Sequence, residues 1–314
     1  MADITLLEAA KHSQDEVERT VAKIIVEASP ILEYLKMRTI NGPAYRYHRE
    51  TSLGTVAYRG VGGTYTPDVG VINPLFEPMV ILGGEIKVDN YEVATMQNLL
   101  NLKAEKFRMK SRQMGIQFSE SFFEGDTAVD GFSFDGLRKR LTGNQLITVA
   151  DGGATLSLAK IDELLDAVIG DNSQKILFMS TKMRRYVTTL VRITTGSSRV
   201  EMTQDRFGRQ QMAYAECPIR IVQREDDAST IFGFDEDDAV AGGGNEDTAS
   251  IYCVKFGSDY VHGIQNMSLP SVRDFGEVQA GPYHLGRIEW YCGLVVKHPR
   301  SAARLYQINE TTPS

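Results

Sequence analysis

Residues 42–84 constrain the fold of this chain more than any other segment. They are rich in β-branched and aromatic residues and are punctuated by glycine and proline, which is typical of extended strands joined by turns. Two extended arms, 44–59 and 69–88, flank the turn sequence GVGGTYTPD at 60–68, and the pair Gly83-Gly84 is expected to interrupt the second arm. An arm of about 15 residues spans about 50 Å, whereas a compact chain of 314 residues has a radius of gyration of about 20 Å. The pattern predicts a hairpin too long to fold away inside its own domain, or a bent pair of ordinary strands broken at the glycines.

A long helical pattern follows the extended segment. Apolar residues, among them Met96, Met114 and Phe118, recur at helical spacing over 89–117, which predicts a helix longer than about 35 Å. One part of this helix has an excess of cations over the single acid Glu105. These cations are Lys103, Lys106, Arg108, Lys110 and Arg112. Such a basic side can face the phosphates of DNA, or it can be solvated or ion-paired within the protein.

The rest of the chain mixes helical and extended patterns. Short amphipathic helices are expected before residue 42, and residues 151–223 alternate helical and strand patterns. Residues 225–247 are strongly acidic and are interpreted as a solvated loop, and the chain is mostly extended from residue 251 onward. This order of elements favours an α+β fold.

Charge and cysteine content narrow the class of protein. A net charge of -7 argues against binding nucleic acid through the whole surface, although local patches can differ from the total. No charge-free apolar run reaches the roughly 18 residues that a membrane helix needs, and the first residues lack the pattern of a signal peptide. The three cysteines, Cys217, Cys253 and Cys292, lie too far apart in sequence for a zinc motif or a disulfide framework, which favours a reducing compartment.

The sequence contains no complete catalytic, phosphate-binding or metal-binding motif. The glycine runs at 60–63 and 242–244 do not complete a phosphate loop, so an enzyme that binds a phosphate-bearing ligand there is a remote alternative. A partial calcium-loop pattern from Asp235 has Val240 at the position that requires glycine. His48 lies in a strand pattern without the cysteines of a zinc deaminase. We therefore expect no enzymatic activity, no cofactor and no bound metal.

Several strings, in this order, resemble the major capsid proteins of tailed bacteriophages, whose Hong Kong 97-like fold is shared with encapsulin shells. The resemblance covers essentially the whole chain, and its strength lies in the order of the strings. They are SPILEYLKMRTING (29–42), LGTVAYRGVGGTY (53–65), LGGEIKVDNYEVA (82–94), ESFFEGD (120–126), FDGLRKRL (134–141), KILFMSTKMRRYVTTL (175–190), YAECPIRIV (214–222), SIYCVKFG (250–257), VHGIQ (261–265) and RIEWYCGLVVKHPRSAARL (287–305).

The resemblance implies four parts of the chain. They are an N-terminal arm (1–41), an extended loop laid over a neighbouring subunit (42–88), a peripheral domain with the long spine helix (89–150 and 277–297), and an α/β axial domain (151–276 and 298–314). It also implies that the protein is a subunit of an icosahedral virion capsid, assembled in the host cytoplasm as hexamers and pentamers around double-stranded DNA. Portal, scaffold or decoration proteins are then further partners, and no membrane is involved.

The contacts between subunits are expected to be noncovalent. Some members of the family crosslink through a lysine of the extended loop, but residues 42–86 contain none. Arginine suits forked pairing with carboxylates, and aromatic side chains bury a large apolar area. The expected intersubunit residues are Arg46, Arg49, Arg59, Tyr65 and Glu77.

An encapsulin-like compartment around a cargo enzyme is the alternative function. It would enclose no nucleic acid. Only about 40 residues precede the hairpin in this sequence, so a separate scaffold, or none, is expected in place of a cleaved N-terminal segment.

Overall fold

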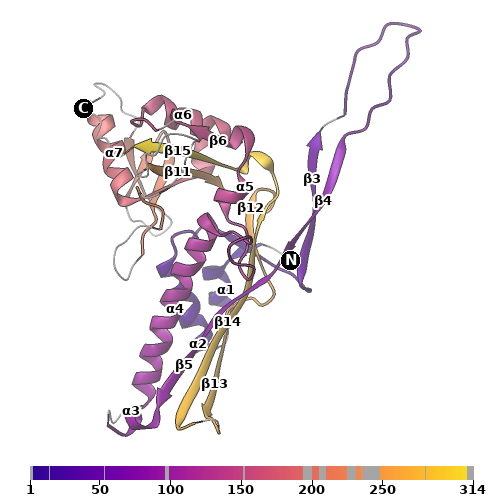
Figure 1. Ribbon diagram of the computed structural model, residues 1–314. Helices are drawn as coiled ribbons and strands as arrows, with labels where there is room; N and C mark the ends of the chain where they lie inside the picture. Colours follow the sequence, from indigo (N-terminus) through magenta and orange to yellow (C-terminus); the bar gives the residue numbers. More distant parts are fainter. Residues whose placement is uncertain are drawn as a thin grey trace.

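The structure is a computed structural model that describes residues 3–13, 15–52, 54–95, 99–150, 153–193, 200–204, 210–224, 231–234, 236, 248–279 and 281–309. Two sheets with their helices form the body, and a two-stranded hairpin projects from it (Figure 1). This mixture of helices and separate sheets confirms the α+β class. No helix in the described part is long and apolar enough to span a bilayer.

The first sheet is built around the 14-residue strand β14 (Tyr283–Val296). On one edge of β14 lie β12 (Val261–Gln265) and β13 (Ser271–Glu277), and on the other lies β5 (Val80–Asp89). The short strands β2 (Lys36–Thr39) and β1 (Ile4–Thr5) extend the sheet beyond β12.

The second sheet has seven strands. Its order is β6 (Leu146–Thr148), β15 (Ala302–Asn309), β11 (Thr248–Lys255), β7 (Lys175–Met179), β10 (Cys217–Ile221), β9 (Gln210–Tyr214) and β8 (Val200–Gln204). Every residue of β7 and β11 is buried, as expected for central strands. The helices α6 (Leu158–Ala167) and α7 (Thr181–Ile193) belong to this part of the chain, as do the short turns η1 (Gly143–Gln145), η2 (Asn172–Gln174) and η3 (Pro299–Ser301).

Strand pairing groups the sequence differently from the predicted domain bounds at two places. Strands β12 and β13 pair within the sheet of β14, although they were grouped with 151–276, and β6 pairs with β15, although it was grouped with 89–150. The predicted bounds of the domains themselves stay a prediction.

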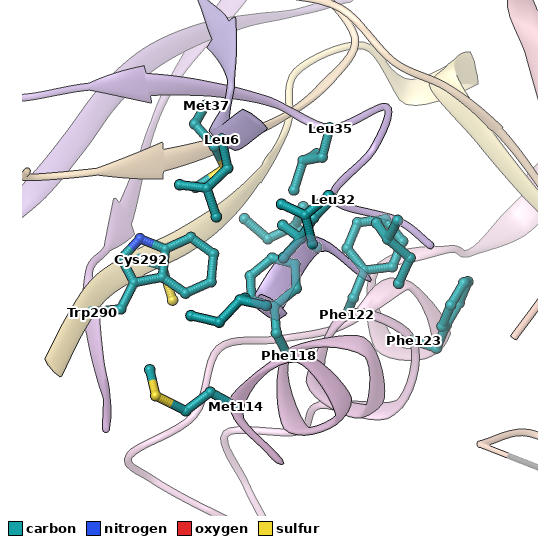
Figure 2. Packing of buried hydrophobic residues seen from close by; sticks show 14 of the residues in the cluster. Leu6, Leu32, Leu35, Met37, Met114, Phe118, Phe122, Phe123, Trp290 and Cys292 are labelled. Atoms are coloured by element: carbon teal, nitrogen blue, oxygen red, sulfur yellow. The ribbon is translucent and has the colours of Figure 1, made fainter. Parts of the chain in front are cut away.

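The long helix α4 (Leu99–Glu124) packs against the first sheet, and the shorter α3 (Asn90–Thr95) precedes it. The 26 residues of α4 correspond to about 39 Å. The helix continues beyond the predicted end at Gln117 because Phe118, Phe122 and Phe123 prolong its apolar stripe and are fully buried. Phe118 packs on Trp290 of β14, with ring centroids 5.1 Å apart (Figure 2). Met96 lies outside the described residues.

Of the short amphipathic helices expected before residue 42, α2 (Glu16–Ala28) is confirmed, and it packs on α4. The helix expected from Pro30 onward was wrong, because residues 30–34 form turns and β2 follows. The additional helix α1 (Leu6–His12) precedes α2. The close approach of α2 to α4 depends on Gly115 of α4. A Cβ atom there would lie 2.6 Å from the carbonyl oxygen of Ile25 and 2.8 Å from the Cβ of Ala28. Glycine is therefore required at this helix crossing.

The hairpin consists of β3 (Ala44–Ser52) and β4 (Val71–Pro78), which pair from Ala44 opposite Pro78 to Ser52 opposite Val71. The prediction of strand structure at 55–59 was wrong, because this segment lies in the loop that closes the hairpin and has no paired neighbour. The predicted interruption at Gly83-Gly84 was also wrong, since β5 runs through both glycines. A Cβ at Gly83 would lie 2.5 Å from the carbonyl oxygen of Ile288, so the glycine permits close pairing with β14.

Candidate interaction site

The tip of the hairpin is the most exposed apolar part of the described chain. Val56 is 95% exposed, and Tyr58 and Val61 are as exposed as in an extended chain. Arg59 donates a hydrogen bond from Nη1 to the carbonyl oxygen of Gly63 (3.1 Å), and its guanidinium lies 5.2 Å from the ring centroid of Tyr65. The predicted residues Arg59 and Tyr65 thus lie together at the tip, exposed to solvent.

The paired strands of the hairpin also display apolar and cationic side chains. Arg46 lies opposite Phe76, with its guanidinium 5.5 Å from the centroid of that ring, and Phe76 is 63% exposed. Arg49 lies opposite Asn73 and is half-buried. The structure therefore distributes the three predicted arginines along the whole length of the hairpin.

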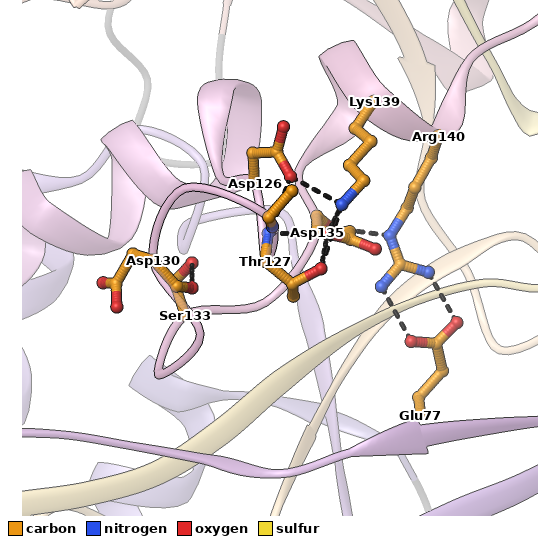
Figure 3. Close-up of polar contacts among 9 residues, drawn as sticks. Glu77, Asp126, Thr127, Asp130, Ser133, Asp135, Lys139 and Arg140 are labelled. Atoms are coloured by element: carbon orange, nitrogen blue, oxygen red, sulfur yellow. Dashed lines mark hydrogen bonds and ion pairs between the residues drawn. The ribbon is translucent and has the colours of Figure 1, made fainter.

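Glu77 has a different position, at the base of the hairpin. Its two carboxylate oxygens accept hydrogen bonds from Nη1 and Nη2 of Arg140 at 2.5 and 2.7 Å (Figure 3). Tyr47 donates its hydroxyl to the same carboxylate (3.2 Å), and burial together with the Glu77 charge raises the pKa of Tyr47 to about 12. Both partners of the ion pair are about 15% exposed, which makes it stronger than a surface pair. Arg140 lies in α5 (Leu137–Arg140), 63 residues away, and sequence reasoning missed it because no local pattern links the two.

The loop of residues 126–135, which we call the knob, connects α4 to α5 next to this ion pair. Lys139 holds it, with Nζ 2.5 Å from Asp126 and 2.9 Å from Asp135 (Figure 3). Thr127 donates its backbone N–H and its hydroxyl to Asp135. Burial raises the pKa of Asp135, but the hydrogen bonds from Lys139 and Thr127 outweigh it and lower the pKa to about 2. The loop is therefore firmly held.

A small separate cluster packs the hairpin onto the body. Tyr47 of β3 is buried with Ile264 of β12 and Val295 of β14. Beside it, the ring of Tyr45 meets His262 edge-on, with centroids 5.9 Å apart, and Arg38 donates to the Tyr45 hydroxyl (2.9 Å).

His262 is fully buried at this joint. Neither ring nitrogen has a side-chain hydrogen-bond partner among the described residues. Burial, together with the charges of Arg38 and Lys297, lowers the pKa of His262 to about 4, although Asp3 opposes this shift. The imidazole is therefore neutral at physiological pH.

Among the five basic residues on α4, Lys103 and Lys106 form ion pairs with described carboxylates of the chain. Lys103 pairs with Asp274 of β13 at 3.0 Å, and Lys106 pairs with Glu92 of α3 at 2.7 Å. Arg108 is exposed, whereas Lys110 and Arg112 are half-buried. A Cβ at Gly84 would lie 2.6 Å from Cε of Lys110, so this side chain crosses β5 at the glycine. Of the two alternatives for the basic side of this helix, ion pairing within the protein is therefore correct for Lys103 and Lys106.

No protein-family model matches the sequence, and neither does any curated protein. Solved structures are similar over nearly the full chain. The holo encapsulin complex from Synechococcus elongatus PCC 7942 is 13% identical with a TM-score of 0.66, and 90% of this chain and 89% of that chain are covered. A structure of Microbacterium phage Oxtober96 is 13% identical with a TM-score of 0.62, covering 90% and 91%. The capsid asymmetric unit of cyanophage A-1(L) is 13% identical with a TM-score of 0.59, covering 90% and 93%.

The similarity covers 90% of the chain in each of these comparisons, and phage and encapsulin structures share it. The similarity therefore lies in the overall fold of the chain. The chain has the Hong Kong 97-like fold of capsid and encapsulin shells.

Proposed function

We propose that this protein is the major capsid subunit of a tailed bacteriophage and assembles into an icosahedral shell of hexamers and pentamers. One observation carries the proposal: a hairpin projects from the body and exposes large apolar side chains that its own chain does not cover. Exposed apolar patches of this kind mark interaction surfaces. A shell repeats one heterologous contact, in which each copy presents one surface and accepts another, and a projecting hairpin provides the surface that is presented.

The contact is noncovalent and uses the apolar area of the hairpin with its arginines. Arg46 and Phe76 act along the strands, and Arg59 and Tyr65 act at the tip, with Arg49 between them. Glu77 serves this contact indirectly, because its carboxylate holds Arg140 of its own chain and thereby sets the direction in which the hairpin leaves the body. Residues 89–150 and 277–297 act as the peripheral part of the subunit, and 151–276 and 298–314 act as the axial part.

The shell encloses double-stranded DNA without sequence specificity, and the basic side of α4 contacts its phosphates. Because Lys103 and Lys106 are ion-paired, the contact rests chiefly on Arg108, with Lys110 and Arg112 beside it. In this proposal the protein is located in the virion, assembles in the host cytoplasm, and works with portal and with scaffold or decoration proteins.

An encapsulin-like compartment is the second candidate function. The similarity to the encapsulin complex, with a TM-score of 0.66, supports a shell of either kind. Native particles distinguish the two functions. Nuclease-protected DNA inside them supports the capsid, whereas a protein cargo without DNA supports the compartment. A glycine-rich phosphate site finds no support, because Gly60 to Gly63 lie at the tip of the hairpin away from any helix; residues 242–244 lie outside the described part of the chain.

Electron microscopy of the purified protein tests the assembly itself. Closed particles are expected, and a discrete monomer or dimer at high protein concentration would refute the proposal. Deletion of residues 60–67 then tests the hairpin: shells of unchanged stability would rule out its role as the intersubunit element.

The DNA contact has its own test. Replacing Arg108 and Lys110 by glutamate should lower the salt concentration at which packaged DNA is lost, because phosphate contacts are weakened by salt. The exposed Arg192 of α7, replaced in the same way, is the control. An unchanged salt dependence in the α4 variant would exclude this helix as the DNA-facing element.

A further inference from the structure

The tip of the hairpin encloses an opening, which we call the eyelet. Residues 55–58 and 64–68 line it, and its volume is about 600 Å³. Figure 1 shows the two arms of the chain separating beyond β3 and β4. Pockets of roughly 300–1,000 Å³ hold small molecules or groups of side chains, so the eyelet is large enough to receive part of another protein.

The eyelet is fixed at both ends. At its neck, Asp68 accepts hydrogen bonds from the hydroxyl and the backbone N–H of Thr55, the latter at 2.9 Å. At its far end, the backbone N–H of Gly63 donates to the carbonyl oxygen of Gly60 (3.1 Å), and Arg59 donates to that of Gly63. The walls between them are mixed: Val56, Ala57 and Pro67 are apolar, whereas Thr64 and Thr66 carry hydroxyl groups. The opening thus has a fixed frame, and its walls present both apolar side chains and hydroxyl groups.

The knob, residues 126–135, has the opposite shape. Val129 and Phe132 at its end are 88% and 90% exposed, which makes them the most exposed large apolar side chains outside the hairpin among the described residues. Asp130 accepts from the backbone N–H of Phe132 (3.0 Å), and the knob is held to α5 through Lys139. Because the backbone of the loop is already fixed, binding costs little backbone conformational entropy.

Each surface carries one charge of opposite sign that can pair with the other, Asp130 on the knob and Arg59 at the eyelet. Asp130 lies between the two apolar side chains of the knob and forms no ion pair among the described residues. Arg59 lies at the end of the eyelet, where its hydrogen bond goes to a neutral carbonyl oxygen. Opposite charges aligned in this way set the register of an interface.

We propose that the knob of one copy inserts into the eyelet of a second copy, with Val129 and Phe132 in the opening and Asp130 facing Arg59. This inference deepens the proposed function and rests on it. The contact is heterologous: each copy contributes one knob and one eyelet, so the contact repeats around a ring without leaving either surface uncovered.

Cross-linking between single-cysteine variants tests the contact directly. The three native cysteines are buried, so introduced surface cysteines are the reactive ones. Subunits with Phe132→Cys are mixed with subunits carrying Ala57→Cys, assembled, and oxidised. We expect a disulfide-linked dimer of the two different variants. Met109→Cys, at an exposed position of α4, replaces Phe132→Cys in the control and should give no dimer.

Assembly of serine variants gives a second measurement. Phe132→Ser should raise the protein concentration at which half of the subunits are in shells by about ten-fold, because the apolar contact is lost. Met109→Ser, which also removes an exposed apolar side chain, should leave that concentration unchanged. Unfolding of the free subunits should be unaffected in both variants.

The outcomes separate this contact from the proposed function. If the wild type forms shells but no cross-link appears and Phe132→Ser assembles normally, the knob and eyelet contact is wrong and the capsid function stands. If the wild type forms no shells, the proposed function fails and this contact fails with it.

Discussion

Acid should loosen the joint between hairpin and body through His262. A buried imidazole whose two nitrogens have no side-chain partner among the described residues can take up a proton only by placing a charge in an apolar site. The pKa of His262 is lowered from 6.5 to about 4 in the folded protein. The unfolded chain therefore binds more protons than the folded chain between these two values, and stability must fall as the pH falls through this range.

The magnitude follows from the two pKa values. At about 1.4 kcal/mol per unit of pKa, the free energy of unfolding should decrease by about 3 kcal/mol between pH 8 and pH 4 from this group alone. Most of the loss lies below about pH 6.5, and it is complete once both states are protonated, below about pH 4. The groups that interact with His262 are the side chains of Asp3, Arg38, Tyr45, Asp259 and Lys297 and the backbone of Tyr260. The carboxylates of Asp3 and Asp259 and the backbone of Tyr260 favour the protonated imidazole, but burial and the two cations outweigh them.

The assay is urea unfolding of unassembled subunits across this pH range. His262→Phe keeps the edge-on ring contact with Tyr45 but cannot bind a proton, so its free energy of unfolding should vary with pH by about 3 kcal/mol less than that of the wild type. His12→Gln changes an exposed histidine and should follow the wild type. Identical pH dependence in the wild type and His262→Phe, or a His262 pKa above 6 by NMR, would refute the reasoning.

Three further predictions concern stability. Glu77→Gln leaves Arg140 with a neutral partner in a half-buried site and should lower the free energy of unfolding in urea by about 2 kcal/mol. A loss below about 0.5 kcal/mol would mean that solvent replaces the ion pair. Gly115→Ala should lower the free energy of unfolding by about 1–3 kcal/mol, because the new Cβ would clash with the Ile25 carbonyl oxygen. The same change in an exposed helix would stabilise the protein by about 1 kcal/mol. A gain in melting temperature would contradict the close helix crossing. Trp290→Ala should cost about 3–5 kcal/mol, and a smaller loss would indicate that the core collapses around the cavity.

Features encoded locally were predictable from the sequence. The turn residues at 60–68 and the strand-forming residues that flank them indicated a hairpin, and the periodic apolar residues indicated α4. The end of α4 was set too early, although Phe118, Phe122 and Phe123 keep the same spacing. The order of short strings, rather than any single motif, indicated the fold.

Features set by contacts between distant segments were not predictable. Gly83 and Gly84 look like strand breakers under a local rule, but in the folded chain they allow β14 and Lys110 to come close. The pairing of Glu77 with Arg140 joins two elements with no common sequence pattern. The same holds for His262, whose neighbours come from separate strands.

The connection between the hairpin and the sheet has a mechanical consequence. Met79 is the only residue between β4 and β5, so a neighbouring copy that pulls on the hairpin applies tension along β5. Strand β5 pairs antiparallel with β14 at ten positions, and the hydrogen bonds of such a ladder run perpendicular to the strands. The tension therefore acts in shear and loads these bonds together instead of opening them one after another. Internal pressure in a shell would therefore pull each subunit along β5, which is the direction in which the paired strands β5 and β14 best resist separation.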